Sequence, residues 1–209
     1  MANSDMEFRE ALAQRHMVRN YTNEPVPAES LDHIIDAGVR APSAGFSQGQ
    51  RFVVVTSERQ RKAIAVAAGE EQYVKRGFDP WISRAPVHIV ICADRDAYLS
   101  RYSEPDKAGV GGPASTEEDW PVPYWWVDAG ASMMAIMLAA VDQGLAAGFL
   151  GAQALDRFHV ALDIPDNILV VGIATIGHAA KDRKSGSIDR GWNARSDVVF
   201  DNQWGQPRA

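Results

Sequence analysis

Apolar positions recur along the chain with helical spacing in some stretches and with strand spacing in others. Intervals of three and four residues predict helices over residues 8–16, 27–41, 58–68 and 155–162. Ser4 and Glu7 have the spacing of a capping box before the first of these helices. A longer stretch predicts a helix over 127–145 that is apolar on most of its faces, as buried helices are.

Short unbroken apolar runs predict the strands. Residues 52–55 and 87–93 have the composition of strands buried on both faces, and 169–176 predicts a third strand. Residues 147–151 predict a short strand or a turn. Because helices and strands are mixed rather than strictly alternating, we expect the α+β class.

Two segments lack a clear apolar period. Residues 94–123 predict a long loop with a short helix near 97–102. From about residue 181 the chain becomes polar and basic, which predicts an extended arm that closes with a strand over 198–200. Since no repeat or linker divides the rest, we expect one domain over 1–209 with an arm at about 181–209.

Composition excludes several classes of function. A formal net charge of −6 argues against a nucleic-acid surface. The single cysteine, Cys92, lies in an apolar run and predicts a buried thiol, and the five histidines have no metal-ligand spacing. Asp128 and Asp142 interrupt the longest apolar stretch, which favours a core helix over a membrane span. The N-terminal residues lack the apolar core of a signal peptide, so we expect a cytoplasmic protein without metal or membrane.

Two clusters point to a bound ligand. Arg15 and Arg19 bracket the turn after the first helix, where guanidinium groups match the shape and charge of a phosphate. The small, polar segment 42–48 precedes a strand and would offer amides and hydroxyls to the edge of a heterocycle. Solvated surface arginines and a simple helix stop are the plainer alternatives. Together the clusters suggest a phosphorylated planar cofactor, and flavin mononucleotide (FMN) fits best.

Three further features have two readings each. Gly151 permits close backbone approach to a ligand, or forms a simple turn. Arg190 either completes a phosphate site or stays solvated like its basic neighbours. An aromatic cluster beside the long helix forms either a wall for a planar substrate or packing in the core and a dimer; it comprises Trp120, Tyr124, Trp125 and Trp126.

Four segments in order resemble the nitroreductase family of flavin enzymes. They are R-H-M-V-R-N-Y at 15–21, A-P-S-A-G-F-S-Q at 41–48, the long apolar segment 128–145 that ends in G-L, and I-P-D-N-I-L-V-V-G-I-A-T-I-G-H at 164–178. The last is followed by a basic arm and V-V-F-D-N-Q-W. Met17 and Phe46 depart from the serine and asparagine usual in that family, which indicates a divergent member.

The resemblance implies a three-layer α+β sandwich, with a central, mostly antiparallel sheet flanked by helices, in an intertwined homodimer. Two FMN molecules would lie at the interface, each touched by both chains. It also implies a ping-pong reaction, in which NADH or NADPH gives hydride to flavin N5 and a nitroaromatic, quinone or related small planar acceptor then takes the electrons. A non-reductive flavin enzyme, which fragments flavin or dehydrogenates a ring, and a flavin-sequestering protein without turnover are the alternatives.

The resemblance also implies roles for individual residues. The Gly151 backbone would face flavin N5, and Arg19 would lie beside N1 and the C2 carbonyl. The acceptor would contact Phe46, Tyr124 and Trp125. The cofactor would be held by Arg15, His16, Met17 and Arg19 of one subunit and Pro42, Ser43 and Ala44 of the other, with Gln48, Leu150, Gly151 and Arg190 as further contacts. We expect the apolar excess of the long helix to be buried against a second copy.

Overall fold

The computed structural model describes residues 6–107, 116–151, 156–183 and 185–208. Within these ranges four strands form one antiparallel sheet with the order β1-β2-β4-β3. The strands are β1 (Gln50–Val55), β2 (Val87–Asp94), β3 (Ala146–Leu150) and β4 (Ile168–Gly177). The central pair is buried along most of its length, because β2 and β4 are apolar on both faces.

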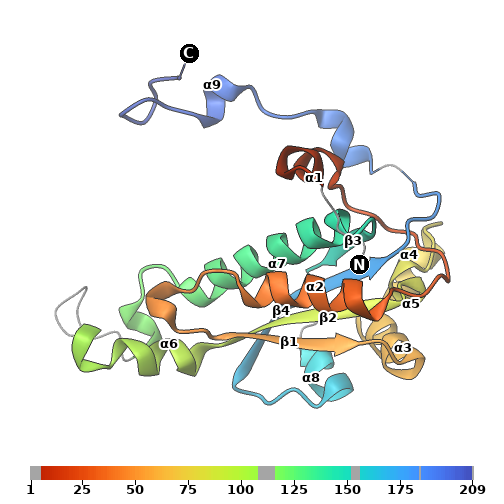
Figure 1. Ribbon diagram of the computed structural model, residues 1–209, viewed down its shortest axis with the longest axis horizontal. Coiled ribbons are helices and arrows are strands. Elements are labelled where there is room, and N and C mark those ends of the chain that lie inside the picture. The colour runs from red at the N-terminus through yellow and green to blue at the C-terminus, as the bar shows by residue number, and fades with distance from the viewer. Residues whose placement is uncertain (1–5, 108–115, 152–155, 184, 209) are drawn as a thin grey trace.

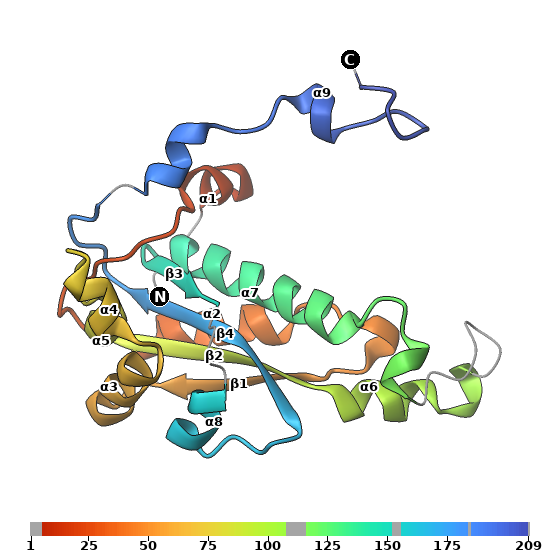
Figure 2. The same cartoon turned by 180° about the vertical axis from the view of Figure 1, so that it is seen from behind.

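Helices cover both faces of this sheet, which makes three layers (Figure 1). One face carries α2 (Ala28–Val39) and α7 (Tyr124–Asp142), packed side by side. The two helices come close because Gly38 has no side chain: a Cβ there would lie 2.8 Å from Ile136. The opposite face carries α3 (Glu58–Ala67), α5 (Trp81–Arg84) and α8 (Asp156–Leu162), as the reverse view shows (Figure 2).

The remaining elements lie around the sandwich or on the C-terminal arm (Figure 1). They are α1 (Phe8–Gln14), α4 (Glu70–Lys75), α6 (Arg95–Tyr102), α9 (Arg195–Val198) and the short 3-10 helices η1 (Ala44–Phe46), η2 (Pro105–Lys107), η3 (Glu117–Asp119) and η4 (Gly186–Arg190). The arm carries η4 and α9. After residue 180 the chain passes α1 and extends away from the sandwich (Figures 1 and 2). Trp192 and Trp204 on this arm are 98% and 89% exposed.

Helix α7 is the most apolar element. By length and composition it could cross a membrane, but its buried residues pack against the sheet and α2, as those of a core helix do. Val127 and Met134 remain exposed on its other side, and Phe8 of α1 is exposed as well. The single chain therefore leaves apolar side chains of α1 and α7 uncovered.

Several sequence predictions need correction. Strand β1 is not buried on both faces, because it is an edge strand and Val54 is exposed. The long helix begins and ends three residues earlier than predicted, at Tyr124 and Asp142, and Gly144 leaves it with a φ of 69°. The predicted strand over 198–200 is wrong: Val198 ends α9, and Phe200 forms only an isolated bridge with Pro207. Ser4 of the predicted capping box lies outside the described residues.

Other predictions are confirmed. Cys92 is buried in β2, and burial raises the pKa of its thiol to about 12. The short helix near 97–102 exists as α6, capped by the Asp94 carboxylate, which accepts from the Ala97 amide.

Candidate functional site

A pocket of about 820 Å³ lies between the turn after α1 and the start of the C-terminal arm. Its first wall is the continuous segment 15–19, so four predicted cofactor contacts, Arg15, His16, Met17 and Arg19, line a single cavity. Its second wall comes from the arm. The lining residues there are Ala179, Ala180, Asp182, Arg183, Ser185, Ser187, Ile188, Gly191 and Trp192.

The segment 15–19 is held flat against the edge of the sheet. The Val18 amide donates to the Ala147 carbonyl over 3.1 Å, and Met17 forms a parallel bridge with the same residue. Val18 itself points inward and is buried. Gly148 permits this close approach, since a Cβ on it would collide with the Val18 carbonyl oxygen. The backbone therefore places Arg15 and Arg19 on the solvent side, where both are half-buried.

The two walls are joined by hydrogen bonds between distant parts of the chain. The Arg19 amide donates to Asp182 Oδ2 over 2.6 Å, and the Asn20 side-chain amide donates to the Lys181 carbonyl over 2.9 Å. The Ala180 amide donates back to the Asn20 carbonyl. Beneath them the Tyr21 hydroxyl bonds Thr175 Oγ1 at 2.8 Å, and burial raises the pKa of this phenol. The pocket is therefore assembled by the fold rather than by one local turn.

The charge of the pocket differs in sign from that of the chain. Three guanidinium groups, those of Arg15, Arg19 and Arg183, line it against one carboxylate, Asp182. Arg183 is held over the ring of Phe78, 5.1 Å from its centroid. In a chain with a net charge of −6, this local excess of positive charge favours an anionic ligand.

The second predicted cluster forms a tight turn at the other end of the sandwich. Gly45, Phe46 and Gln48 have φ values of 61°, 58° and 50°, and two of these residues are not glycine. The Gln48 amide donates to Ser43 Oγ, and Arg101 Nε donates to the Gly45 carbonyl, each over 2.9 Å. Backbone in this region is costly for side-chain-bearing residues and persists only where the surroundings hold it. Phe46 is 76% exposed at the tip.

An aromatic cluster packs behind this turn. The ring of Trp120 lies 4.6 Å from that of Tyr102 and 5.9 Å from that of Tyr124, centroid to centroid. Tyr124 is partly exposed, as an acceptor contact requires. Trp125 is fully buried against Tyr98, so the expected substrate contact is wrong for this residue. Neighbouring residues on a helix point in different directions, and the side chain of Trp125 points into the core.

Within one chain the two clusters do not meet. The turn 42–48 lies beside the first turns of α7, since the Ala44 amide bonds Asp128. The segment 15–19 lies on β3, which follows the other end of α7. The 19 residues of α7 span roughly 28 Å. Leu150 ends β3, Gly151 follows it, and Arg190 is exposed in η4. These three residues do not line the pocket, although Ile188 and Gly191 do.

The structure adds residues that the sequence analysis did not single out as site residues. Asp182, Arg183 and Trp192 line the pocket. Arg183 is one of the basic neighbours of Arg190 that could complete a phosphate site, whereas no pattern pointed to Asp182 or Trp192. The sequence also contains a glycine-rich stretch, Gly109–Gly112, which lies outside the described residues. Among the described residues, no group of three or more His, Cys, Asp or Glu side chains lies close enough to hold a metal ion.

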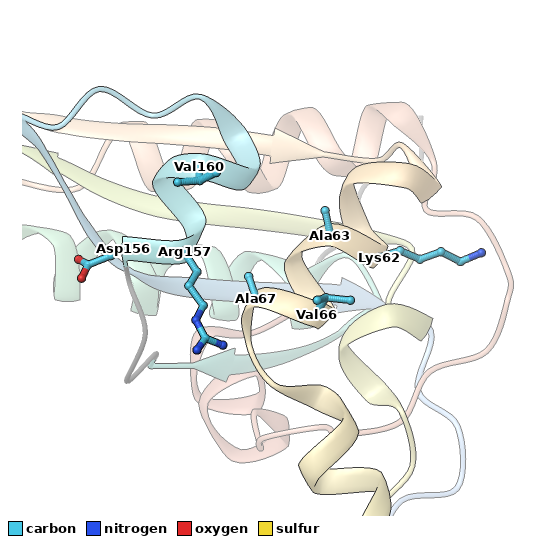
Figure 3. Close-up of a pocket in the computed structure, with 7 residues that line it drawn as sticks. All are labelled: Lys62, Ala63, Val66, Ala67, Asp156, Arg157 and Val160. Atoms are coloured by element: carbon cyan, nitrogen blue, oxygen red, sulfur yellow. The ribbon is translucent and has the colours of Figure 1, made fainter.

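A second hollow lies on the opposite face of the sheet, between α3 and α8 (Figure 3). Small apolar side chains line it together with Lys62, Asp156 and Arg157; the apolar ones are Ala63, Val66, Ala67 and Val160. None of the predicted cofactor or substrate residues lines this hollow. This hollow is therefore separate from the arginine-lined pocket at 15–19.

Comparison with known proteins decides the family. The model of the nitroreductase family matches residues 12–178, which include both predicted clusters, β1 to β4 and α7. The chain belongs to the nitroreductase family. Residues 179–209, which hold the arm, lie beyond the match.

Some relatives of this nitroreductase-family chain match less than half of it, and others match most of it. An FMN reductase [NAD(P)H] of Bacillus subtilis is 38% identical over 91 residues, which cover 42% of this chain and 32% of that protein. A protein of Archaeoglobus fulgidus, provisionally named an NADH dehydrogenase/NAD(P)H nitroreductase, is 28% identical over 174 residues, with 81% and 83% covered.

Solved structures confirm the fold of this family member. A nitroreductase family protein from Clostridium novyi has a TM-score of 0.66 at 23% identity, with 97% of both chains covered. Nitroreductase A from Vibrio parahaemolyticus has a TM-score of 0.73 at 22% identity, with 98% of this chain and 78% of that chain covered. The α+β sandwich predicted from the sequence is thus the fold of the nitroreductases.

Proposed function

We propose that this chain binds FMN as a homodimer and is an NAD(P)H-dependent oxidoreductase that reduces small planar acceptors such as nitroaromatics and quinones. The observation that carries the proposal is the arginine-lined pocket at 15–19, in a chain of the nitroreductase family. The names of the relatives, an FMN reductase and an NAD(P)H nitroreductase, support the same cofactors.

The residues present fit a flavin nucleotide. A volume of about 820 Å³ is within the range of small-molecule sites. Three guanidinium groups suit a phosphate monoester, which carries nearly two negative charges. Asp182 opposes this charge, but its carboxylate is engaged by the Arg19 amide. In the proposed site Arg15 holds the phosphate, and His16 and Met17 line the approach. Arg190 lies in η4 next to the lining residue Gly191, and we propose that it turns toward the phosphate when FMN binds.

A second copy would complete the site. We propose that the turn 42–48 of the partner subunit comes to the pocket of the first, so that Pro42, Ser43, Ala44 and Gln48 border the flavin ring. The exposed apolar side chains of α1, α7 and the arm support this arrangement, because a second copy would cover them. A twofold axis repeats every contact, so a dimer would contain two such sites.

The protein would position the flavin and set the electric field around its ring, and no side chain is assigned as a general acid or base. The chemistry that bound FMN supplies is acceptance of hydride from a nicotinamide and delivery of electrons to an acceptor. Arg19 is assigned to the ring edge with N1 and the C2 carbonyl, where its positive charge favours the reduced form. The Gly151 backbone is assigned to N5, together with Leu150 at the end of β3. Phe46 and Tyr124 would contact the acceptor and keep water from it.

The test begins with the absorbance spectrum of the purified protein and mass spectrometry of the released chromophore. Protein stripped of ligand is then titrated with FMN, and the complex is mixed with NADH or NADPH in a stopped-flow instrument. Rapid bleaching, followed by reoxidation when a quinone is added, is the expected result. Bleaching that fails over minutes would favour flavin sequestration or non-reductive chemistry instead. Protein that binds no FMN would refute the proposal.

The variant Arg15→Ala/Arg19→Ala tests the pocket itself. We expect FMN affinity to fall by roughly a hundredfold, since two charge-assisted contacts are lost. Arg59→Ala is the matched control, because Arg59 is an exposed arginine on α3, across the sheet from α7. Equal affinity in both variants would place the flavin elsewhere.

A cytoplasmic location stays a prediction from the N-terminal composition.

A further inference from the structure

We propose that Asp128 of α7 is a positioning residue of the flavin site, which holds the turn 42–48 in the shape that the cofactor requires. The inference rests on the proposed function and deepens it, because it names a residue that acts on the ligand only through Ala44.

Asp128 makes two hydrogen bonds through one oxygen. Its Oδ2 accepts from the Ala44 amide over 2.9 Å and from the Tyr98 hydroxyl over 2.8 Å. The Asp128 residue is 6% exposed, and the ion pairs found among the described residues do not include it. A carboxylate buried without a cation is unfavourable for folding, so its presence calls for another reason.

The turn that Asp128 holds is the strained part of the candidate site. The Ala44 amide begins η1, directly before the left-handed residues Gly45 and Phe46. Without an acceptor for this amide, the turn would lose its one hydrogen bond to α7 among those found in the described part of the chain. Asp128 thus links the shape of the turn to the rigid central helix.

Tyr98 extends the link to the aromatic cluster. It is fully buried, and its burial together with the hydrogen bond to Asp128 raises the pKa of the phenol, so Tyr98 stays protonated and donates. Its ring lies 6.4 Å from that of Trp120 and abuts Gly49, where a Cβ would collide with it. Asp128 and Tyr98 therefore connect the turn to the proposed acceptor wall.

The chain contains a matched control for this carboxylate. Glu70 of α4 is 7% exposed, and its Oε1 accepts from the amides of Ile82 and Ser83 over 2.6 and 2.9 Å. It therefore has the same burial and the same number of donors as Asp128, but it holds α5 rather than the turn. A substitution of either acid by its amide removes a charge and keeps one acceptor oxygen.

The experiment compares Asp128→Asn, Glu70→Gln and wild type as FMN-loaded protein. We expect Asp128→Asn to weaken FMN binding by about tenfold and to change the visible circular dichroism of bound FMN, because a neutral amide oxygen accepts the hydrogen bonds of Ala44 and Tyr98 more weakly than a carboxylate does and so holds the turn less firmly. We expect Glu70→Gln to lower the melting temperature but to keep the wild-type FMN affinity and spectrum. Tyr98→Phe should change the spectrum in the same direction and less strongly, and should add little to Asp128→Asn.

The outcomes separate the two proposals. Wild type that binds no FMN would overturn the proposed function. Wild type that binds FMN, with an unchanged affinity and spectrum in Asp128→Asn, would overturn only the role of Asp128. An equal loss of affinity in Glu70→Gln would overturn it too, since the effect would then be one of general stability. If Asp128→Asn does not fold, Tyr98→Phe decides: a changed spectrum supports the inference and an unchanged one refutes it.

Discussion

The backbone amide of Arg19 donates a 2.6 Å hydrogen bond to Asp182 Oδ2, across a sequence separation of 163 residues. The contact joins the first basic turn to the root of the C-terminal arm and so closes the pocket. It also places a carboxylate among the arginines of the pocket that we propose for the flavin nucleotide. Asp182 thus holds the wall of the pocket together, but its negative charge repels the phosphate of the proposed ligand.

Replacement of Asp182 separates these two effects. Asp182→Asn keeps an acceptor oxygen for the Arg19 amide but removes the negative charge, so we expect FMN to bind about threefold more tightly at low ionic strength. The gain should shrink at high ionic strength, because salt screens exposed charges. Fluorescence titration measures both. Asp182→Ala lacks the acceptor and should bind FMN more weakly than Asp182→Asn; the reverse order would contradict this account.

Arg19→Ala tests the assignment of this cation to the flavin ring. Loss of the positive charge should lower the midpoint potential of bound FMN by on the order of 30 mV, which corresponds to a tenfold change in a two-electron equilibrium. Spectroelectrochemical titration against a reference dye provides the measurement. Arg15→Ala is the comparison: it should weaken binding of FMN with little change in potential, since Arg15 is assigned to the phosphate. An unaltered potential in Arg19→Ala would move the role to another residue.

Gly148→Ala tests the close approach of the segment 15–19 to β3. The added Cβ would meet the Val18 carbonyl and would lie 2.9 Å from Thr175 Oγ1 and 3.0 Å from Tyr21 Oη. We expect a loss of about 1–3 kcal/mol in the free energy of unfolding, together with weaker FMN retention. Denaturant unfolding and FMN titration measure these quantities. Gly130→Ala is the control, since its Cβ would meet nothing within 4 Å; an equal loss there would argue against the mechanism.

His88 predicts how stability depends on pH. Burial lowers the pKa of this imidazole to about 4, and Nε2 lies 2.7 Å from the Ile82 carbonyl. The unfolded chain, with a histidine pKa near 6.5, binds more protons than the folded chain between the two values. The stability that neutral His88 contributes is therefore fully present above about pH 6.5 and falls as the pH drops toward 4, by about 3 kcal/mol.

Unfolding by urea at several pH values between 6.5 and 4 measures this loss. His88→Gln removes the titrating group, so its profile should be flatter than that of wild type over this range. His33→Gln is the control for the substitution itself, because His33 is an exposed histidine. A wild-type profile that matches that of His88→Gln would show that another group governs the acid limb.

The arm provides a test of the dimer. Light scattering should give twice the chain mass of 22.8 kDa. If a second copy covers the arm, Trp192→Ser/Trp204→Ser should raise the dimer dissociation constant by tenfold or more, roughly the effect of losing an aromatic hot spot. Val66→Ser on α3 is the control, since Val66 is 77% exposed on the other face of the sandwich. A monomer that binds FMN would refute the shared site.

Strong apolar periodicity predicted the core elements closely. The predicted helix 58–68 and strand 87–93 correspond to α3 and β2 to within one residue at each end. Helices α4 and α5 were missed, because they are short and α5 is held by the Glu70 carboxylate from outside its own segment. The exposure of β1 could not be read from its sequence, since an apolar run does not specify which strand lies at the edge of a sheet.

The site was predictable in its local parts. Arg15 and Arg19 lie in a single pocket, because the whole segment 15–19 lines it. The partners of that segment come from the arm, so no local pattern could identify Asp182. Trp125 was misassigned because the helical phase, not the residue type, decides which member of an aromatic run points inward. Asp128 carried a signal, as a charge within an apolar stretch, but its contacts depend on the tertiary fold.

Cys92 has a practical consequence. The sequence contains no other cysteine. The Cys92 thiol is buried in the sheet, and burial raises its pKa, which favours the protonated form. Electrophilic quinones and maleimide dyes react with thiolates, so they should leave the native chain unmodified. A single cysteine introduced elsewhere, for instance on the arm, would therefore be the one site that such a dye labels.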